Sequence, residues 1–384
     1  MRGGGLRKGC WDAHTHLSAG AADLHDLDLR EARSTEAIEA ALRAAAQDRP
    51  AGCWIEGWGW DGTSSIHDVA PHRPVFVARR DGHAAWVNPA GRAILGLDPE
   101  TSVVEEAAFD AARARLPQRS ADDRAAALRV RLAELAALQV SAVDDIVESW
   151  GPDVYTRLRD RGELSVAIRM WLSEGLSDRE CEALRREFPA ADPLLAAVGI
   201  KIFLDGTLGA RTAALSHPYA DDPGNAGRLR MDEREIPERV RLWAARGWPV
   251  ALHAIGDRAV TCALDALERA PRPRWGAHRI EHAQVVKRSD LPRFGANGVV
   301  ASVQPGHWRD DAPFLASRLG ERPGVVAHPL RSLAQFGAKV ALGSDWPVSS
   351  WDPETVLAAA ADPARGEEAV ASTIGWAWYT SGPP

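Results

Sequence analysis

Residues 249–282 of this chain read PVALHAIGDRAVTCALDALERAPRPRWGAHRIEH. Two short apolar runs, at 249–254 and 276–282, each carry a histidine at the carboxyl end, and the residues between them have a helical pattern. A strand, a helix and a second strand in this order form a βαβ unit, in which the two strands lie parallel. His253 and His282 are therefore predicted at the same edge of one sheet.

The same alternation recurs along the whole chain. Eight short apolar runs predict strands, at 9–14, 140–146, 164–172, 198–205, 249–254, 276–282, 298–304 and 338–345. Their near-continuous apolar content is typical of strands covered on both faces. The clearest helix, 121–139, follows Ser120 as its predicted N-cap. We therefore predict an α/β fold, a (β/α)8 TIM barrel over residues 1–384.

The interval between the first two predicted strands is too long for one strand-helix repeat. It contains WIEGWGW at 54–60 and RPVFVARRDGHAAWVN at 73–88, which we expect to form a small strand-bearing insertion over residues 50–120. The Pro- and Gly-rich runs at 215–227 and 320–324 predict loops within a domain and no linkers between domains.

Composition and charge exclude several classes of protein. With 46 basic and 53 acidic residues the net charge is −7, which gives no reason to expect binding to nucleic acid or to a membrane surface. The start, MRGGGLRKGC, has no apolar segment behind it and no run of about 18 apolar residues follows, so we expect a soluble, cytoplasmic protein. The four cysteines match no zinc-ribbon or redox spacing and are expected to be free thiols.

Polar residues that are uncommon in apolar strands stand in or at the ends of the predicted strands. They are His14, His16, Lys201, His253, His282 and Asp345. Five of the six lie at carboxyl ends, where barrel enzymes place their chemistry. Imidazole and carboxylate groups bind zinc and similar divalent ions, so the set predicts a site for one or two such ions.

Each of these residues also has a structural interpretation. His14 and His16 alternate in WDAHTH at 11–16, so both side chains leave one face of a strand, but an isolated pair of this kind is also common at strand ends. Lys201 fits an ordinary ion pair, and Asp345 fits an N-cap before a helix, a role that a ligand can share. Singly, His253 and His282 would be interpreted as core histidines.

The surrounding segments resemble the amidohydrolase superfamily, and in particular its YtcJ-like, amidohydrolase-3 branch. They run from about residue 10 to residue 350: DAHTHL, GWGWD, RPVFVARRDGHAAWVN, KIFLDGTLGARTAAL, HAIGDRAV, RIEHAQ, SVQPGHWRDD and GSDWPV. The resemblance implies that the four histidines are metal ligands and that Asp345 is both a ligand and the catalytic acid/base. It also implies that Lys201 is carboxylated on its amine and bridges two ions, which requires the neutral amine that burial favours.

Further residues are predicted to contact the substrate. Asp205 and Gly206 open DGTLGARTAAL at 205–215, which is expected to be a flexible loop over the site or, alternatively, a long connection. The resemblance also places His83, Trp86 and His307 in the pocket, although a surface histidine would explain each histidine equally. Asp12, Asp257 and Glu281 are expected to support the site, bond the backbone or cap a helix.

The predicted function is metal-dependent hydrolysis of a carbon–nitrogen bond, in an amide, formamide or cyclic amide of a small-molecule substrate. The alternatives are a metal-binding barrel without turnover and a hydrolase of esters or phosphoesters on the same scaffold. Related proteins usually add a β-sandwich, but only 13 residues precede His14 and 39 follow Asp345. We therefore expect little or none of that domain, or trimmed ends, and a barrel flank that favours a homo-oligomer.

Overall fold

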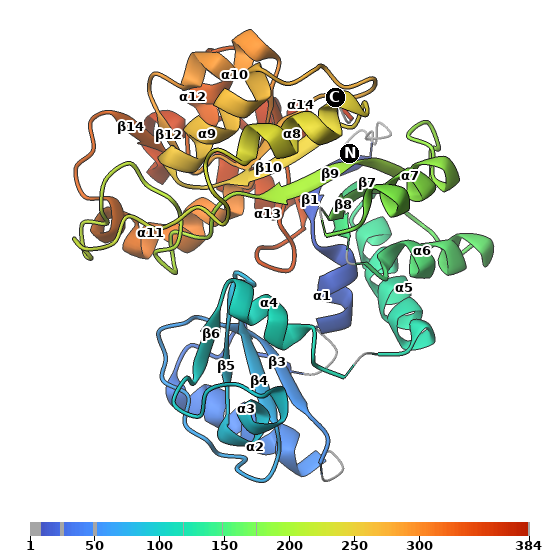
Figure 1. Ribbon diagram of the computed structural model, residues 1–384, viewed down its shortest axis with the longest axis vertical. Coiled ribbons are helices and arrows are strands. Elements are labelled where there is room, and N and C mark those ends of the chain that lie inside the picture. The colour runs from blue at the N-terminus through green and yellow to red at the C-terminus, as the bar shows by residue number, and fades with distance from the viewer. Residues whose placement is uncertain are drawn as a thin grey trace, which may run out of the picture. The chain divides into compact units, whose positions relative to one another are not determined.

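The computed structural model describes residues 9–23, 27–48, 52–117, 119–147, 149–173 and 175–382. The chain divides into two compact units (Figure 1). One unit comprises Met1–Ser18 and Arg129–Pro384, and the other comprises Ala19–Leu128. The predicted insertion at 50–120 lies within the second unit.

The first unit is built on one eight-stranded sheet in which all neighbours are parallel. Its strands, in sheet order, are β1 (Cys10–Thr15), β7 (Val140–Val147), β8 (Ala167–Ser173), β9 (Leu195–Phe203), β10 (Val250–Ala254), β11 (Arg279–His282), β13 (Val300–Val303) and β15 (Lys339–Leu342). All eight predicted strands are present, which confirms the barrel.

The first and last strands meet at their carboxyl ends and nearly close the barrel. The backbone N–H of Asp345 donates to the carbonyl of His14, and that of His16 donates to the carbonyl of Trp346, each at 2.7 Å. Gly343 lies in this seam, where an added Cβ would be 2.7 Å from the Cβ of His14. Only glycine allows this approach, which brings the histidines of β1 next to the segment that carries Asp345.

Helices follow the strands and pack around them (Figure 1). They are α5 (Ala121–Ala137), α6 (Gly151–Asp160), α7 (Asp178–Glu187), α8 (Ile236–Ala245), α9 (Asp257–Glu268), α10 (Leu291–Asn297), α11 (Pro305–Leu319), α12 (Leu330–Gln335), α13 (Pro353–Ala360), α14 (Ser372–Thr380) and the short 3-10 helix η1 (Pro363–Glu368). Helix α5 begins as predicted, because Ser120 Oγ accepts the backbone N–H of Asp123 at 3.1 Å.

Two features of this unit differ from the expectations. β12 (Val285–Lys287) and β14 (Val325–Ala327) form an antiparallel ribbon that was not predicted. The segment after β9 is packed where an open loop was expected, because Leu208, Leu215 and Tyr219 are buried in an apolar cluster with residues of the neighbouring loops and α11; its flexibility stays a prediction. Burial of this kind ties the segment to the barrel.

The second unit begins within α1 (Leu17–Asp23) and contains a five-stranded mixed sheet covered by helices on both faces. Its strands are β2 (Leu27–Asp28), β3 (Ile55–Trp60), β4 (Val75–Arg79), β5 (Ala84–Val87) and β6 (Val103–Glu105), and its helices are α2 (Thr35–Asp48), α3 (Pro89–Leu95) and α4 (Ala107–Arg113). Along β4, Val75 and Val77 pack with α2, whereas Phe76 packs with α3 and α4. This alternation is the one expected of a strand.

All four cysteines are free, as predicted, and Cys10, Cys181 and Cys262 are buried. None of the helices in the described residues combines the length and apolar content that a membrane span requires.

Candidate metal centre

The predicted ligands gather at the carboxyl edge of the sheet. His14 lies in β1 and His16 directly after it, His253 and His282 lie at or near the ends of β10 and β11, and Asp345 follows β15. Sheet pairing sets Ala254 opposite His282 and Ala251 opposite Lys201, so β9, β10 and β11 present their side chains in a shared register. The parallel sheet thus brings residues from the whole length of the chain to one edge.

Asp345 is the centre of this group. Its Oδ1 lies 3.2 Å from Nε2 of His14 and 3.3 Å from Nε2 of His16. Its Oδ2 lies 4.0 Å from Nδ1 of His282. One potential ligand atom from each of His14, His282 and Asp345 falls within 4.8 Å of the other two. A single ion can therefore contact all three residues.

Several atoms in this group are buried without a hydrogen-bond partner among the described residues. They include Nε2 of His14, Oδ1 of Asp345 and Nζ of Lys201. Leaving such polar atoms unsatisfied costs about 1–3 kcal/mol each. A cation placed among them would satisfy the imidazole and carboxylate lone pairs, and this donor set suits zinc or a similar divalent ion. The residues present therefore fit a divalent metal.

Protonation states also suit ligation. The pKa of Asp345 is held well below its usual value, because the neighbouring imidazoles, His14 first, outweigh the opposing effect of burial. Burial and the nearby His253 lower the pKa of His282 well below its usual value. The site therefore favours a charged carboxylate and a neutral imidazole, which are the forms that bind metal.

A buried chain of charges orients His14. Nδ1 of His14 contacts Oε2 of Glu281, and Oε1 of Glu281 contacts Nε of Arg279. Burial opposes ionisation of Glu281, but Arg279 and His14 together lower its pKa to about 2. A carboxylate at Nδ1 keeps the proton on that nitrogen and leaves the Nε2 lone pair of His14 for an ion.

Asp144, inside the barrel, anchors this chain of charges. Its carboxylate accepts hydrogen bonds from Nη1 of Arg279 at 2.6 Å and Nε of Arg169 at 2.8 Å. The indole N–H groups of Trp11 and Trp171 donate to the same carboxylate at 2.9 and 2.8 Å. Sequence reasoning missed Asp144 and Arg279; the signal was a charged residue inside a predicted apolar strand, in VSAVDDI and GAHRIEH.

His282 is oriented in a similar way by an amide. Its Nδ1 lies 2.8 Å from Oε1 of Gln304, while the amide nitrogen of Gln304 donates to the carbonyl of Ser302 at 3.3 Å. The backbone of His282 has φ 73° and that of Asp345 has φ 57°. Left-handed geometry costs a non-glycine residue about 1–3 kcal/mol and is typical of functional sites.

Lys201 and His253 complete the predicted set. The contacts of their side-chain nitrogens differ from those of the residues grouped around Asp345. Nε2 of His253 faces the carbonyl of Gly206 at 3.2 Å, although its ring centroid is 4.5 Å from that of His282. Nζ of Lys201 lies 4.8 Å from the ring centroid of Phe203, and burial lowers the pKa of Lys201 to about 8. Ligation by these two residues stays a prediction.

The family assignment agrees with this geometry. The model of the amidohydrolase family matches residues 9–371. The chain belongs to this family. Among curated relatives, Protein LONG AFTER FAR-RED 3 of Arabidopsis thaliana is 30% identical over 387 residues, covering 90% of this chain and 66% of that protein. Putative amidohydrolase YtcJ of Bacillus subtilis is 28% identical, covering 92% of this chain and 72% of that protein, which confirms the YtcJ-like resemblance.

Two further similarities bear on fold and chemistry. The chain is 22% identical over 425 residues to N-substituted formamide deformylase of Arthrobacter pascens, covering 97% of this chain and 77% of that protein. A solved metal-dependent hydrolase from Pyrococcus horikoshii superposes with a TM-score of 0.79 at 26% identity, covering 97% of this chain and 79% of that one. Of the Arabidopsis relative described above, the chain spans 66% of the length.

The predicted substrate contacts lie in different places. Asp205 accepts the backbone N–H groups of Ala214, Ile255 and Gly256 at 2.8–3.0 Å, so its carboxylate holds two loops together. His307 is buried beside Asp345, with its Nε2 3.3 Å from Oδ2.

His83 and Trp86 belong to the second unit. There Nδ1 of His83 is 3.1 Å from a carboxylate oxygen of Glu106, and Trp86 is buried in one of the two apolar clusters. Contact of His83, Trp86, Asp205, Gly206 and His307 with a substrate stays a prediction.

The expected supporting residues are found in supporting positions. Asp12 accepts the backbone N–H groups of His14 at 3.2 Å and Ser344 at 2.9 Å, which links β1 to the segment after β15. Asp257, at the start of α9, accepts the backbone N–H of Ser216 at 2.9 Å. Both residues fix backbone segments that lead into the site.

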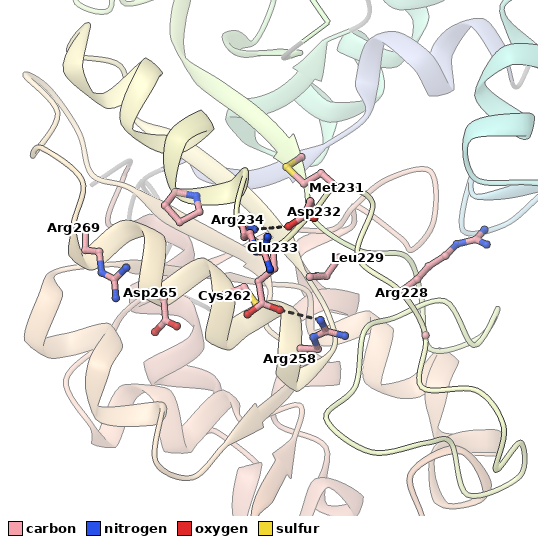
Figure 2. Close-up of a pocket in the computed structure, with 12 residues that line it drawn as sticks. Arg228, Leu229, Met231, Asp232, Glu233, Arg234, Arg258, Cys262, Asp265 and Arg269 are labelled. Carbon is pink, nitrogen blue, oxygen red and sulfur yellow. Dashed lines mark hydrogen bonds and ion pairs between the residues drawn. The ribbon is translucent and has the colours of Figure 1, made fainter.

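The structure also has a pocket of about 790 Å³ between α9 and residues 227–234 (Figure 2). Arg258 and Glu233 pair across it at 2.9 Å, and Asp265, on the same helix, pairs with Arg293 at 2.5 Å. Cys262 is buried in its wall. None of the predicted ligands lines this pocket, so it adds nothing to the metal centre.

Proposed function

We propose that this chain is a metal-dependent hydrolase that cleaves a carbon–nitrogen bond in an amide, formamide or cyclic amide, with one or two zinc ions. One observation carries the proposal. Oδ1 of Asp345 is buried, has no hydrogen-bond partner among the described residues, and lies 3.2–3.3 Å from Nε2 of His14 and of His16. Such a carboxylate between two imidazoles is suited both to an ion and to proton transfer.

In this proposal His14, His16, His253, His282 and Asp345 hold the metal. A divalent ion, when bound, supplies Lewis acidity for the carbonyl group and for water at this site. Asp345 takes the proton from the attacking water and delivers it to the leaving nitrogen. Its two oxygens have different neighbours. Oδ1 faces His14 and His16, and Oδ2 faces His282 and His307.

Lys201 is proposed to carry a carbamate that joins the ligand set. Formation of a carbamate joins the amine nitrogen to the carbon of carbon dioxide and releases a proton, so it needs the neutral amine. Two observations support this role: Nζ is buried without a hydrogen-bond partner among the described residues, and burial lowers its pKa to about 8. Burial thus favours the neutral amine that this reaction needs.

Carbon–nitrogen cleavage is favoured over other hydrolyses by two arguments. An amide nitrogen leaves only when it is protonated, and Asp345 is placed to return the proton that it takes from water. The similarity to a formamide deformylase, which covers 97% of this chain, supports the same bond type. A small-molecule substrate, a homo-oligomer and a cytoplasmic location stay predictions.

The test begins with purified protein whose metal content is measured by elemental analysis. Zinc-loaded protein is then assayed on a panel of N-substituted formamides, amides and cyclic imides, with carboxylic and phosphate esters in parallel. The wild type should hydrolyse at least one carbon–nitrogen substrate. Asp345→Asn should lose that activity and retain part of its metal.

Asp290→Asn is the matched control, because Asp290 is also buried but binds Thr261 and Arg293. Its activity should equal that of the wild type. If the protein hydrolysed only esters or phosphoesters, the proposed carbon–nitrogen bond type would be wrong. Stoichiometric zinc with no turnover across the panel would favour a metal-binding barrel.

A further inference from the structure

Two glutamines meet two histidines at the mouth of the barrel. Gln304 turns its carbonyl oxygen toward Nδ1 of His282, at 2.8 Å. Gln284 turns its amide nitrogen toward Nδ1 of His307, at 2.9 Å. All four side chains are buried. The two pairs have similar distances but opposite hydrogen-bond polarity.

The polarity of each pair follows from its other neighbours. The amide nitrogen of Gln304 donates to the carbonyl of Ser302 at 3.3 Å, which leaves the amide oxygen of Gln304 to accept a hydrogen bond from His282. For the second pair, Nε2 of His307 is 3.3 Å from a carboxylate oxygen of Asp345. If Nε2 of a neutral His307 carried no proton, its lone pair would face a lone pair of the Asp345 carboxylate, and the two would repel. A neutral His307 therefore keeps its proton on Nε2, and its Nδ1 accepts a hydrogen bond from Gln284.

Among the described residues, the N–H of His307 therefore has no well-aligned acceptor. Nε2 makes no hydrogen bond to any described residue, although His307 is only 7% exposed. The carboxylate of Asp345 is close enough to raise the pKa of His307 against the opposing effect of burial, but it is not aligned to accept a hydrogen bond from Nε2. The ring lies parallel to that of His282, with centroids 5.7 Å apart. A buried donor of this kind beside the proposed base is placed to meet a ligand.

We propose that Gln284 is a positioning residue that holds His307 in the neutral tautomer protonated on Nε2, and that this N–H donates to the carbonyl oxygen of the substrate. His307 is then a hydrogen-bond donor and no metal ligand, whereas His282 has the opposite tautomer and binds the ion. The donor stabilises the negative charge that develops on the carbonyl oxygen as water adds. The substrate contact rests on the proposed function; the tautomers do not.

Tautomers can be measured without turnover. Protein labelled with ¹⁵N in its histidine rings is studied by two-bond ¹H–¹⁵N correlation NMR, without metal and with zinc, at pH 8.5, where ordinary histidines are neutral. His307→Gln and His282→Asn assign the signals. His307 should show the pattern of the tautomer protonated on Nε2, and His282 that of the tautomer protonated on Nδ1. The reverse pattern at His307 would overturn the inference.

Matched substitutions of the two glutamines separate polarity from packing. Gln304→Glu keeps an acceptor opposite His282, so both histidine patterns should stay unchanged. Gln284→Glu replaces a donor by an acceptor, so His307 should lose its neutral Nε2-protonated pattern. Gln284→Met places neither a hydrogen-bond donor nor a strong acceptor opposite His307, so His307 should show a mixture of its two neutral tautomers. An unchanged His307 signal in both Gln284 variants would refute the positioning role.

Metal content and kinetics test the role of His307 itself. His307→Gln should bind as much zinc as the wild type, whereas His282→Asn should bind less. On a substrate found in the panel, His307→Gln should lower kcat by about 10²–10³-fold, as expected for loss of one donor to an oxyanion. Loss of zinc in His307→Gln would make His307 a ligand. A wild type without turnover would refute the proposed function and the substrate contact but leave the tautomer result standing.

Discussion

Replacing Glu281 by Gln tests whether the chain of buried charges sets the metal affinity of His14. Glu281 is fully buried and contacts Nδ1 of His14 with one oxygen and Nε of Arg279 with the other. Glutamine has nearly the same shape but no charge, so it polarises the His14 ring less. If its amide nitrogen turns toward His14, the ring loses the acceptor that keeps its proton on Nδ1.

The expected magnitudes follow from these contacts. Removing such a partner of a metal-binding histidine costs about 10–100-fold in affinity, which is about 1.4–2.7 kcal/mol. Breaking a buried ion pair can cost about 3–5 kcal/mol of folding stability. Here the loss should be smaller, because Arg279 keeps its hydrogen bonds to Asp144 at 2.6 Å and to the carbonyl of Ala13 at 2.8 Å. Glu281→Gln should therefore fold and bind zinc weakly.

Zinc affinity is measured by competition with a chromophoric chelator, and stability by urea unfolding of the metal-free protein. Asp145→Asn is the matched control, since Asp145 is an equally buried carboxylate that binds Tyr155 and the backbone of Ser18 and contacts no predicted ligand. The control should bind zinc like the wild type. Wild-type zinc affinity in Glu281→Gln would refute the reasoning, whatever happens to stability.

Three further predictions concern the seam, the metal and pH. Gly343→Ala should lower the free energy of unfolding by about 1–3 kcal/mol in urea titrations, because its Cβ would lie 2.7 Å from that of His14; Gly324→Ala, with no atom within 4 Å, should have little effect. Zinc at 100 times its Kd should raise the free energy of unfolding by about 2.7 kcal/mol, seen as a higher Tm that His282→Asn abolishes. Burial raises the pKa of Asp145 from 3.8 to about 6, so the folded state holds this proton more tightly than the unfolded chain. The stabilisation that this bound proton gives is complete below pH 3.8 and is lost as the pH rises through 6, which lowers the free energy of unfolding by up to about 3 kcal/mol. Urea unfolding of Asp145→Asn from pH 4 to 7 should lack this loss.

Strand positions were predictable because a parallel barrel strand is buried on both faces and leaves a continuous apolar run in the sequence. The run at 249–254 became β10, at Val250–Ala254, and the run at 140–146 became β7, at Val140–Val147. The ribbon of β12 and β14 left no such signal. Each of its strands has three residues, and Val285 pairs with Ala327 far along the chain. Pairing at that distance depends on tertiary structure.

The metal centre was predictable for a related reason. Parallel strands end at one edge, so polar residues at strand ends, such as His282 and Asp345, are brought together by the topology alone. The residues that orient them were not predictable. Asp144 lies within β7 and Arg279 begins β11, 135 residues away, and only the nearly closed sheet places their side chains within hydrogen-bond distance.

By itself the sequence determined the number and order of the barrel strands and the residues that stand at their carboxyl ends. Hydrophobic periodicity and chain connectivity are local properties, so they can be read without coordinates. Only the tertiary structure decided which nitrogen of each histidine faces the site. That choice depends on partners such as Glu281 for His14 and Gln304 for His282, which approach from other strands and loops. A proton on an imidazole ring follows the nearest acceptor in space, and its position in the chain does not determine it.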